Sequence, residues 1–367
     1  MVPLIILIVL SVLYISHYFI YYSLAYFFSI TSKGSKAILA LVLFLLPISF
    51  IALMILARWS DNYFLRALYF SSGLWLGVGL TLVTFFAVAW AAWGATRLVT
   101  HSPRPALFGL VTVVLAGLYC GYGVWNAYHP RIEHVRIRMQ NLPSDWRGKK
   151  VVQLSDVHLG HILGTAFLRD IVQKVNTLDP VMVLITGDLF DGMDGRLDEL
   201  VVPLNDLRAP WGIYFVTGNH ETYLGTDRAF AALSKTKVRI LHDEMVVVNG
   251  LQIIGIDFPE REFSKDIAAV IQTLPEYNRQ MPSLLLYHSP TQVEQAKAAG
   301  IRLQLSGHTH HGQIFPIQII SRLIYQKYYT GLHVEGDYTI YTSSGAGTWG
   351  PTMRTGNHPE VTVIHLE

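Results

Sequence analysis

The first 128 residues carry almost no charge, and this limits what they can fold into. Only seven of them are Asp, Glu, Lys or Arg, and these seven fall between four apolar stretches. The stretches cover residues 2–30, 37–57, 67–93 and 106–128, and each reaches the roughly 20 residues that an α-helix needs to cross a bilayer. Trp, Tyr and Phe gather near their ends, as is usual at a membrane–water interface. Four such stretches in a row favour a transmembrane region with four helices (residues 1–128) over buried helices of a soluble core.

The flanks of these stretches bear on topology. No basic segment precedes the first stretch, which is also too long for the core of a signal peptide, so we expect a membrane anchor and not a cleaved leader. Four spans put both ends of the chain on one side. Lys and Arg near span ends prefer the cytoplasmic side. Five of them lie on the side of the C-terminal domain and four on the opposite side, which favours a cytoplasmic C-terminal domain on a protein of the plasma or inner membrane.

Charge and cysteine content exclude several functions. Six of the seven charged residues before residue 129 are basic and one is acidic, a net charge of +5. Because the whole chain has a net charge of +2, residues 129–367 have a net charge of −3. A mildly acidic soluble part without a basic stripe argues against nucleic-acid binding. Cys120 is the only cysteine and lies in the fourth stretch, which excludes a disulfide framework and a thiolate metal site. Among Asp, Glu, Lys, Arg and His residues, His17 alone lies deep in a stretch. We expect it to be packed or interfacial and not part of an ion pathway.

Beyond the apolar region, we expect a linker at residues 129–145 and a soluble domain at 146–367. Within the linker, residues 132–139 alternate in polarity and could form an edge strand. Helical spacing of apolar residues predicts helices at 165–177 and 291–299, and Ser264 could cap another helix that runs to Leu274. Continuous apolar runs, typical of sheets covered on both faces, predict strands at 151–154, 181–185, 213–216, 251–256, 284–287, 303–305, 338–341 and 361–366.

Five short polar motifs each follow one of these predicted strands. In chain order they are Asp156-Val157-His158, Gly187-Asp188-Leu189-Phe190-Asp191, Gly218-Asn219-His220-Glu221, His288 and Gly307-His308-Thr309-His310. Ligands of α/β sheets collect at the carboxyl ends of strands. Carboxylates, amide oxygens and imidazoles are ligands of divalent metals. We therefore expect the motifs to converge on a two-metal hydrolytic site.

Each motif is weak when taken alone. Asp156 and His158 would share one face of a regular strand, but a loop after the strand could equally aim both at one ion. A single Asp-x-His is more often ordinary surface chemistry than a metal site, and a single Gly-Asn-His-Glu can be a turn. The order of all five, each after an apolar strand, is what favours the metal site.

This order of motifs resembles the calcineurin-like metallophosphoesterase family over residues 149–367. The ending Ser344-Gly345-Ala346-Gly347-Thr348, followed by Arg354, is similar to the YkuE/YaeI-type branch, in which some members act on lipid-linked pyrophosphates. The resemblance implies two packed mixed β-sheets flanked by helices, an α/β fold that carries two divalent metal ions. Mixed oxygen and nitrogen ligands suit Mn, Fe or Zn.

The resemblance also implies a role for each motif residue. Asp156, His158 and His310 would bind one metal, Asn219, His288 and His308 the second, and Asp188 would bridge both. A hydroxide between the metals would attack phosphorus, because the two charges lower the pKa of water. His220 would protonate the leaving oxygen or stabilise the phosphoryl group, and Asp191 would orient His220 and support its charged form.

The roles of two further histidines near the motifs, His311 and His161, remain open. The residue after His310 is often Gly in related sequences, whereas here it is His311, and register favours His310 as the ligand. His311 and His161 are either substrate contacts or plain surface side chains. The twin-Arg export signal of some relatives is replaced here by the four apolar stretches.

Residues 314–329, IFPIQIISRLIYQKYY, directly follow the last motif and are strongly apolar, with Arg322 and Lys327 among them. They either pack in the core or form a surface that enters the headgroup region of a membrane. We expect a membrane-anchored phosphoesterase that hydrolyses phosphoester or pyrophosphate bonds, of phosphodiesterase or pyrophosphatase type, in a lipid-linked or membrane-associated substrate. The alternatives are a tethered phosphodiesterase for a soluble substrate, and a membrane sensor or transport module with a regulatory metal domain.

Overall fold

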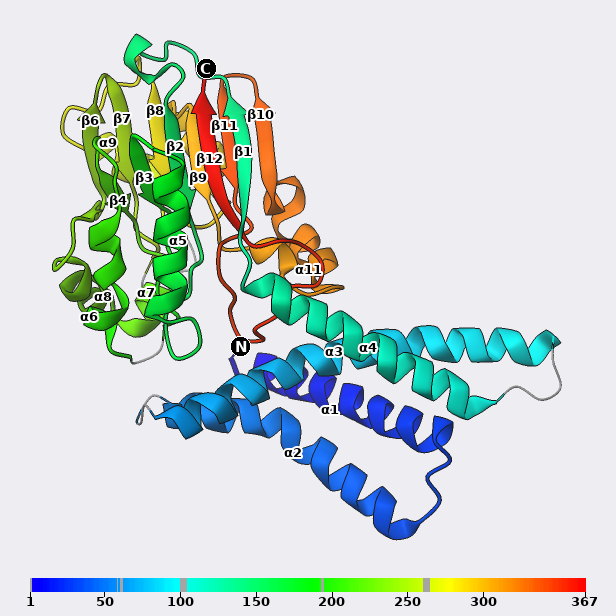
Figure 1. Cartoon of the computed structure of the whole chain (residues 1–367). Helices are drawn as coiled ribbons and strands as arrows, with labels where there is room; N and C mark the ends of the chain where they lie inside the picture. The colour runs from blue at the N-terminus through cyan, green and yellow to red at the C-terminus, as the bar shows by residue number, and fades with distance from the viewer. Residues whose placement is uncertain (1, 58, 60–61, 100–103, 193–194, 260–264) are drawn as a thin grey trace. The chain divides into compact units, whose positions relative to one another are not determined.

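The chain divides into two compact units in a computed structural model that describes residues 2–57, 59, 62–99, 104–192, 195–259 and 265–367. One unit, here called the helical unit, contains Met1–Trp125 and Gly350–Thr355. The other, the catalytic unit, contains Asn126–Trp349 and Gly356–Glu367. Figure 1 shows the elements of both.

Four long helices form the helical unit, as expected from the apolar stretches. All four are long and apolar enough to cross a membrane, by length and composition. Their bounds are α1 Val2–Phe27, α2 Lys33–Ala57, α3 Tyr63–Val99 and α4 Pro105–Ala127.

Small side chains and aromatic rings pack these helices. The buried face of α3 includes Gly73, Gly77 and Gly79, residues that let neighbouring backbones approach closely. The His17 ring accepts a hydrogen bond from Trp75 Nε1 at 2.9 Å and is 4 % exposed, which fits the expected packing role. A cluster of aromatic rings on α1, α3 and α4 adds further contacts and includes Phe27, Phe86, Trp90, Trp93 and Phe108.

Six residues near the C-terminus, Gly350–Thr355, belong to the helical unit although the flanking residues belong to the catalytic unit. The Tyr119 hydroxyl on α4 donates to the carbonyl oxygen of Thr355 at 2.8 Å, and the Arg354 backbone N–H donates to the carbonyl oxygen of Gly123 at 2.9 Å. The Arg354 side chain is fully buried. No local feature of the sequence predicts that Gly350–Thr355 belong to the helical unit.

The catalytic unit contains two six-stranded mixed sheets, which confirms the expected fold (Figure 1). The first has the order β1-β12-β2-β3-β4-β5 and the second the order β10-β11-β9-β8-β7-β6. The strands are β1 Arg131–Ile137, β2 Lys150–Leu154, β3 Met182–Ile185, β4 Ile213–Phe215, β5 Arg239–Ile240, β6 Glu244–Val248, β7 Leu251–Gly255, β8 Ser283–Leu286, β9 Leu303–Ser306, β10 Gly331–Glu335, β11 Tyr338–Thr342 and β12 Glu360–Leu366.

Helices connect and flank the strands of the catalytic unit. The α-helices are α5 Thr165–Thr177, α6 Leu197–Leu200, α7 Asn219–Leu224, α8 Thr226–Leu233, α9 Ile267–Thr273, α10 Val293–Ala299 and α11 Ile317–Tyr325. Short 3₁₀ turns are η1 Ser144–Trp146, η2 Val202–Asp206, η3 His310–Gly312 and η4 Gln326–Tyr329.

Apolar side chains on both faces of the strands build three core layers, which is why the strands read as continuous apolar runs. Along β3, Met182 and Leu184 point into a cluster that side chains of both sheets share. Val183 and Ile185 point to the opposite face, into a cluster that includes α5 and α8 residues. The other face of the second sheet packs on α9 and α10.

Several local expectations need correction. The residue that caps α9 is Asp266, whose side chain accepts from the Ala269 N–H at 3.0 Å, whereas Ser264 lies outside the described residues. The edge strand expected within the linker is confirmed, since β1 lies at the edge of the first sheet and pairs in parallel with β12. Strands β5, β6 and β10 were not expected. Strands β5 and β10 lack an apolar run, whereas the run at residues 245–248 of β6 is a local signal that was missed.

Candidate metal centre

The five motifs all lie just beyond the carboxyl ends of central strands. Asp156 follows β2, Asp188 follows β3 and Asn219 follows β4 in the first sheet. In the second sheet, His288 follows β8 and His308 follows β9. Parallel pairing of β2 with β3, of β3 with β4 and of β8 with β9 places these ends along the same edges.

The motif backbones adopt an uncommon conformation. Asp156, His158, Asp188, His308 and His310 all have positive φ, between 49° and 73°. Non-glycine residues rarely adopt this left-handed region, and where they do they cluster at functional sites. Asp156 and His158 therefore reach the site from a loop and not from one face of a strand, the second of the two arrangements considered above.

Two motif glycines make room for carboxylates. A Cβ on Gly307 would lie 2.1 Å from Asp156 Oδ2, and a Cβ on Gly218 would lie 2.2 Å from Asp188 Oδ1. No side chain fits at such separations, so these positions require glycine for close approach.

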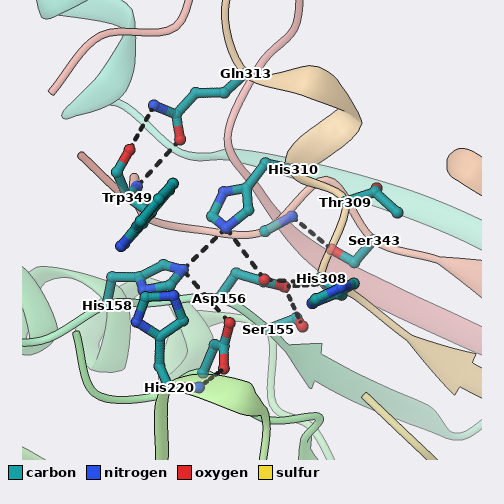
Figure 2. A network of polar contacts seen from close by, with 12 residues as sticks. Ser155, Asp156, His158, His220, His308, Thr309, His310, Gln313, Ser343 and Trp349 are labelled. Carbon is teal, nitrogen blue, oxygen red and sulfur yellow. Dashed lines mark hydrogen bonds and ion pairs between the residues drawn. The ribbon is translucent and has the colours of Figure 1, made fainter. Parts of the chain in front are cut away.

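The first cluster of ligand atoms comes from Asp156, His158 and His310, and all three residues are labelled in Figure 2. His310 Nε2 lies 2.9 Å from His158 Nε2 and 3.3 Å from Asp156 Oδ1. Ser155 Oγ donates to Asp156 Oδ2 at 2.5 Å, and the His308 N–H donates to the same carboxylate, which orients it toward the histidines.

The second cluster comes from Asp188, His288 and His308. His288 Nε2 lies 3.1 Å from Asp188 Oδ2 and 3.2 Å from His308 Nδ1. His288 Nδ1 donates to the Thr186 carbonyl oxygen at 2.8 Å, which fixes the ring with Nε2 toward the cluster. Asn219 Oδ1 is buried with no hydrogen-bond donor among the described residues. A cation would satisfy this oxygen, and the oxygen and imidazole donors of both clusters suit a borderline divalent metal.

Asp188 lies between the clusters. Its Oδ2, 3.1 Å from His288 Nε2, is also 3.9 Å from His158 Nε2. Burial disfavours the charged Asp188 carboxylate, but His288, His220 and His158 outweigh burial and lower its pKa well below the usual value.

Burial and charged neighbours also shift the pKa values of the other buried groups. Burial lowers the pKa of His288, but attraction to Asp188 prevails and raises it to about 9. Burial, and then repulsion from His288, lower the pKa of His308 to about 3. Burial is also the main reason that the pKa of Asp156 rises to about 6. Such opposed shifts among neighbouring groups are typical of functional sites.

His220 stands beside the first cluster, with its ring centroid 4.6 Å from that of His158 (Figure 2). Its Nδ1 donates to the backbone carbonyl oxygen of Asp191 at 2.9 Å, which leaves Nε2 as the nitrogen that can exchange a proton with substrate. This differs from the expected role of the Asp191 carboxylate. Asp191 Oδ1 instead lies 3.8 Å from His158 Nδ1, and burial, then Asp188, raise the pKa of Asp191 well above the usual value.

Glu221, to which the sequence analysis gave no role, organises the backbone around Asp188. Its fully buried carboxylate accepts from the backbone N–H groups of Gly218 at 2.7 Å, Asp188 at 2.9 Å and Phe190 at 3.0 Å. The sequence signal that could have identified Glu221 was its position in the third motif.

Trp349, also missed, is half-exposed next to His220, with ring centroids 5.6 Å apart. The Gln313 side chain pairs with the Trp349 backbone through two hydrogen bonds, both 3.1 Å, which are drawn in Figure 2. His311 belongs to neither cluster of ligand atoms found among the described residues, and its ring centroid lies 5.2 Å from that of Tyr329. His161 is 6 % exposed and so is not a surface side chain.

Two mixed sheets with a polar, metal-compatible site at their strand ends define an α/β protein of the metallophosphoesterase type. Comparison with known families agrees, since residues 149–312 match the model of the calcineurin-like phosphoesterases. A metallophosphoesterase of Helicobacter pylori is 33% identical over 274 residues, which cover 72% of this chain and 73% of that protein. The chain belongs to the calcineurin-like phosphoesterase family.

Two further relatives are similar to this chain over much of its length. A Bos taurus protein described as a transmembrane protein with metallophosphoesterase domain is 34% identical over 282 residues, 72% of this chain and 62% of its own length. The metallophosphoesterase YkuE of Bacillus subtilis is 27% identical over 285 residues, 72% of this chain and 98% of that protein. Family membership indicates a metal-dependent phosphoester hydrolase, and the four apolar helices support a location in a membrane.

Proposed function

We propose that this chain is a membrane-anchored, two-metal phosphoesterase that cleaves phosphoester or pyrophosphate bonds in a lipid-linked or membrane-associated substrate. The observation that carries the proposal is the position of Asp188, whose carboxylate adjoins both clusters of ligand atoms. Asp156, His158 and His310 would hold one cation, and Asn219, His288 and His308 the other, with Asp188 shared. When bound, two such cations supply Lewis acidity and lower the pKa of water for attack on phosphorus.

The residues of the chain do the rest of the work. The Asp191 carbonyl oxygen fixes the His220 ring with Nδ1 protonated, so a doubly protonated His220 can give the Nε2 proton to the leaving oxygen. Glu221 fixes the backbones of Asp188 and Gly218. The Asp188 carboxylate in turn accepts a hydrogen bond from the backbone N–H of His220 at 2.8 Å. These contacts keep the ligands and His220 in one arrangement before substrate arrives, which favours catalysis by preorganisation.

The full-length chain in detergent, stripped of metal by a chelator and reloaded with Mn, Fe(II) or Zn, tests this proposal on an aryl phosphodiester. We expect turnover only after reloading, and a loss of about 10²-fold or more in Asp188→Asn. An absence of turnover with every metal would favour the sensor or transport module.

The substrate class has a test of its own. A phosphodiester or pyrophosphate carried by a lipid in mixed micelles is compared with its water-soluble analogue. We expect a higher kcat/KM for the lipid. Equal values would favour a phosphodiesterase that is merely tethered to the membrane.

A further inference from the structure

Helix α11 presents its apolar side chains to solvent and not to the core. We define the α11 face as Ile319, Ile320, Leu323 and Ile324, which are 57%, 55%, 75% and 64% exposed. Their spacing of three and four residues puts them in one stripe. An amphipathic helix normally buries this stripe, but on α11 the buried residue is Ser321, at 8% exposed. Core packing, one of the two roles considered from the sequence, therefore does not describe α11.

The α11 face is anchored to the metal centre at both ends of the helix. Before α11, the turn η3 begins at the ligand His310. Near its end, the Tyr325 ring stands perpendicular to the ring of His308, with centroids 5.7 Å apart. Because both ends are fixed on ligand residues, whatever covers the face lies a short distance from the site.

The chain itself indicates what covers the face. Four helices suited to crossing a membrane precede the catalytic unit. Only three residues, 128–130, separate the end of α4 from the start of β1, a reach of about 10 Å. The chain also returns to the helical unit at Gly350, directly after Trp349 beside His220. Both connections are short, so the chain tethers this unit to any bilayer that holds the four helices. An exposed apolar stripe that reaches such a surface gains by leaving water.

The charge of α11 agrees with a lipid surface. The helix has no Asp or Glu, and its one charged residue is Arg322, which is exposed. A cation next to an inserted apolar stripe can contact lipid phosphate groups.

We propose that the α11 face lies in the headgroup region of the bilayer in which the chain is anchored and holds the mouth of the metal centre at the level of lipid phosphates. The location of α11 in the bilayer is independent of catalysis. Its role in presenting lipid phosphates to the site rests on the proposed function.

The location is tested in the full-length chain with Cys120→Ser, which removes the single cysteine. A fluorophore is attached at Leu323→Cys, and in a second protein at Val247→Cys, a control that is 49% exposed on the edge strand β6. Both proteins are reconstituted in phosphatidylcholine vesicles with and without a lipid that carries a nitroxide near the top of its acyl chain. We expect quenching at position 323 to exceed that at 247 by about twofold or more. Equal quenching at both positions overturns the inference, including the case in which a second copy of the chain covers the face.

The functional role is tested with Leu323→Glu, with Val247→Glu as the matched control. We expect Leu323→Glu to lower kcat/KM for a lipid phosphodiester in vesicles by about tenfold, the order of effect for one apolar side chain kept out of the interface. The ratio of this kcat/KM to that for the water-soluble aryl diester should fall only in Leu323→Glu. An unchanged ratio overturns the presenting role. If the wild-type chain turns over neither substrate, the proposed function fails while the quenching result still decides where α11 lies.

Discussion

Replacing Glu221 with Gln tests how the buried carboxylate supports the metal centre. Glu221 is fully buried and accepts from three backbone N–H groups, those of Gly218, Asp188 and Phe190. Glu221→Gln keeps the size of the side chain but turns one acceptor oxygen into an NH₂ group. With the remaining oxygen toward Gly218 and Asp188, the Phe190 N–H loses its acceptor. A buried N–H without a partner costs about 1–3 kcal/mol.

The ionisation of Glu221 acts in the opposite direction. Burial, and then repulsion from Asp188, raise its pKa from 4.5 to about 7. A carboxyl whose pKa is higher in the folded state stabilises that state below the unfolded pKa, and this stabilisation is lost as pH rises through the folded pKa. The shift corresponds to on the order of 3 kcal/mol, which the wild type loses between pH 4.5 and about 7. The Gln side chain cannot ionise and loses nothing over this range.

The assay is thermal unfolding of the metal-stripped, full-length chain in detergent at pH 5 and pH 8, with the exposed Glu276→Gln as control. We expect Glu221→Gln to lower Tm at pH 5 by about 2–4 °C for each kcal/mol lost. At pH 8 the difference from wild type should shrink toward zero, because the wild type then carries a buried charge. A deficit that is equal at the two pH values, or larger at pH 8, would refute this reasoning.

Three further predictions concern the site. His220→Ala should lower turnover by about 10²-fold or more while metal content stays at the wild-type level, whereas Asp188→Asn should lower both, as measured by steady-state kinetics and elemental analysis; equal metal loss in the two variants would contradict the roles given to them. His310→Ala should reduce bound metal per chain and His311→Ala should not, since only His310 adjoins Asp156 and His158; the reverse result would shift the register of ligands by one residue. Trp349→Ala should raise KM more than it lowers kcat, because its half-exposed ring stands where a substrate would meet His220; a change confined to kcat would assign the ring to positioning.

Much of the fold was predictable because its signals are local. Low charge over long apolar stretches indicates helices that leave water, and helix α5 begins and ends where its apolar spacing predicts, at Thr165 and Thr177. The central strands were visible for the same reason, as they are buried on both faces. The edge strand β10 was not, because its half-exposed sequence has no distinct apolar run and the strand is fixed by its neighbour. Edge strand β6 did carry a local signal, the apolar run at residues 245–248, which was missed.

The list of candidate ligands was also within reach of the sequence, because all five motifs occur in one order and each follows an apolar strand. The sequence could not predict which atom of each residue makes the contact. The Asp191 carbonyl oxygen, and not its carboxylate, orients His220, and this depends on how the loop after β3 turns. Glu221 and Trp349 could not be assigned either, because their partners lie in other segments of the chain.

Composition and periodicity are enough to indicate four apolar helices, an α/β domain and a set of candidate oxygen and nitrogen ligands at successive strand ends. Only the tertiary structure decided that the Asp188 carboxylate adjoins both clusters, that Gly350–Thr355 join the helical unit, and that the apolar stripe of α11 faces outward. The physical reason is that composition and periodicity record how much a segment prefers to leave water. The direction in which it does so depends on contacts between residues far apart along the chain.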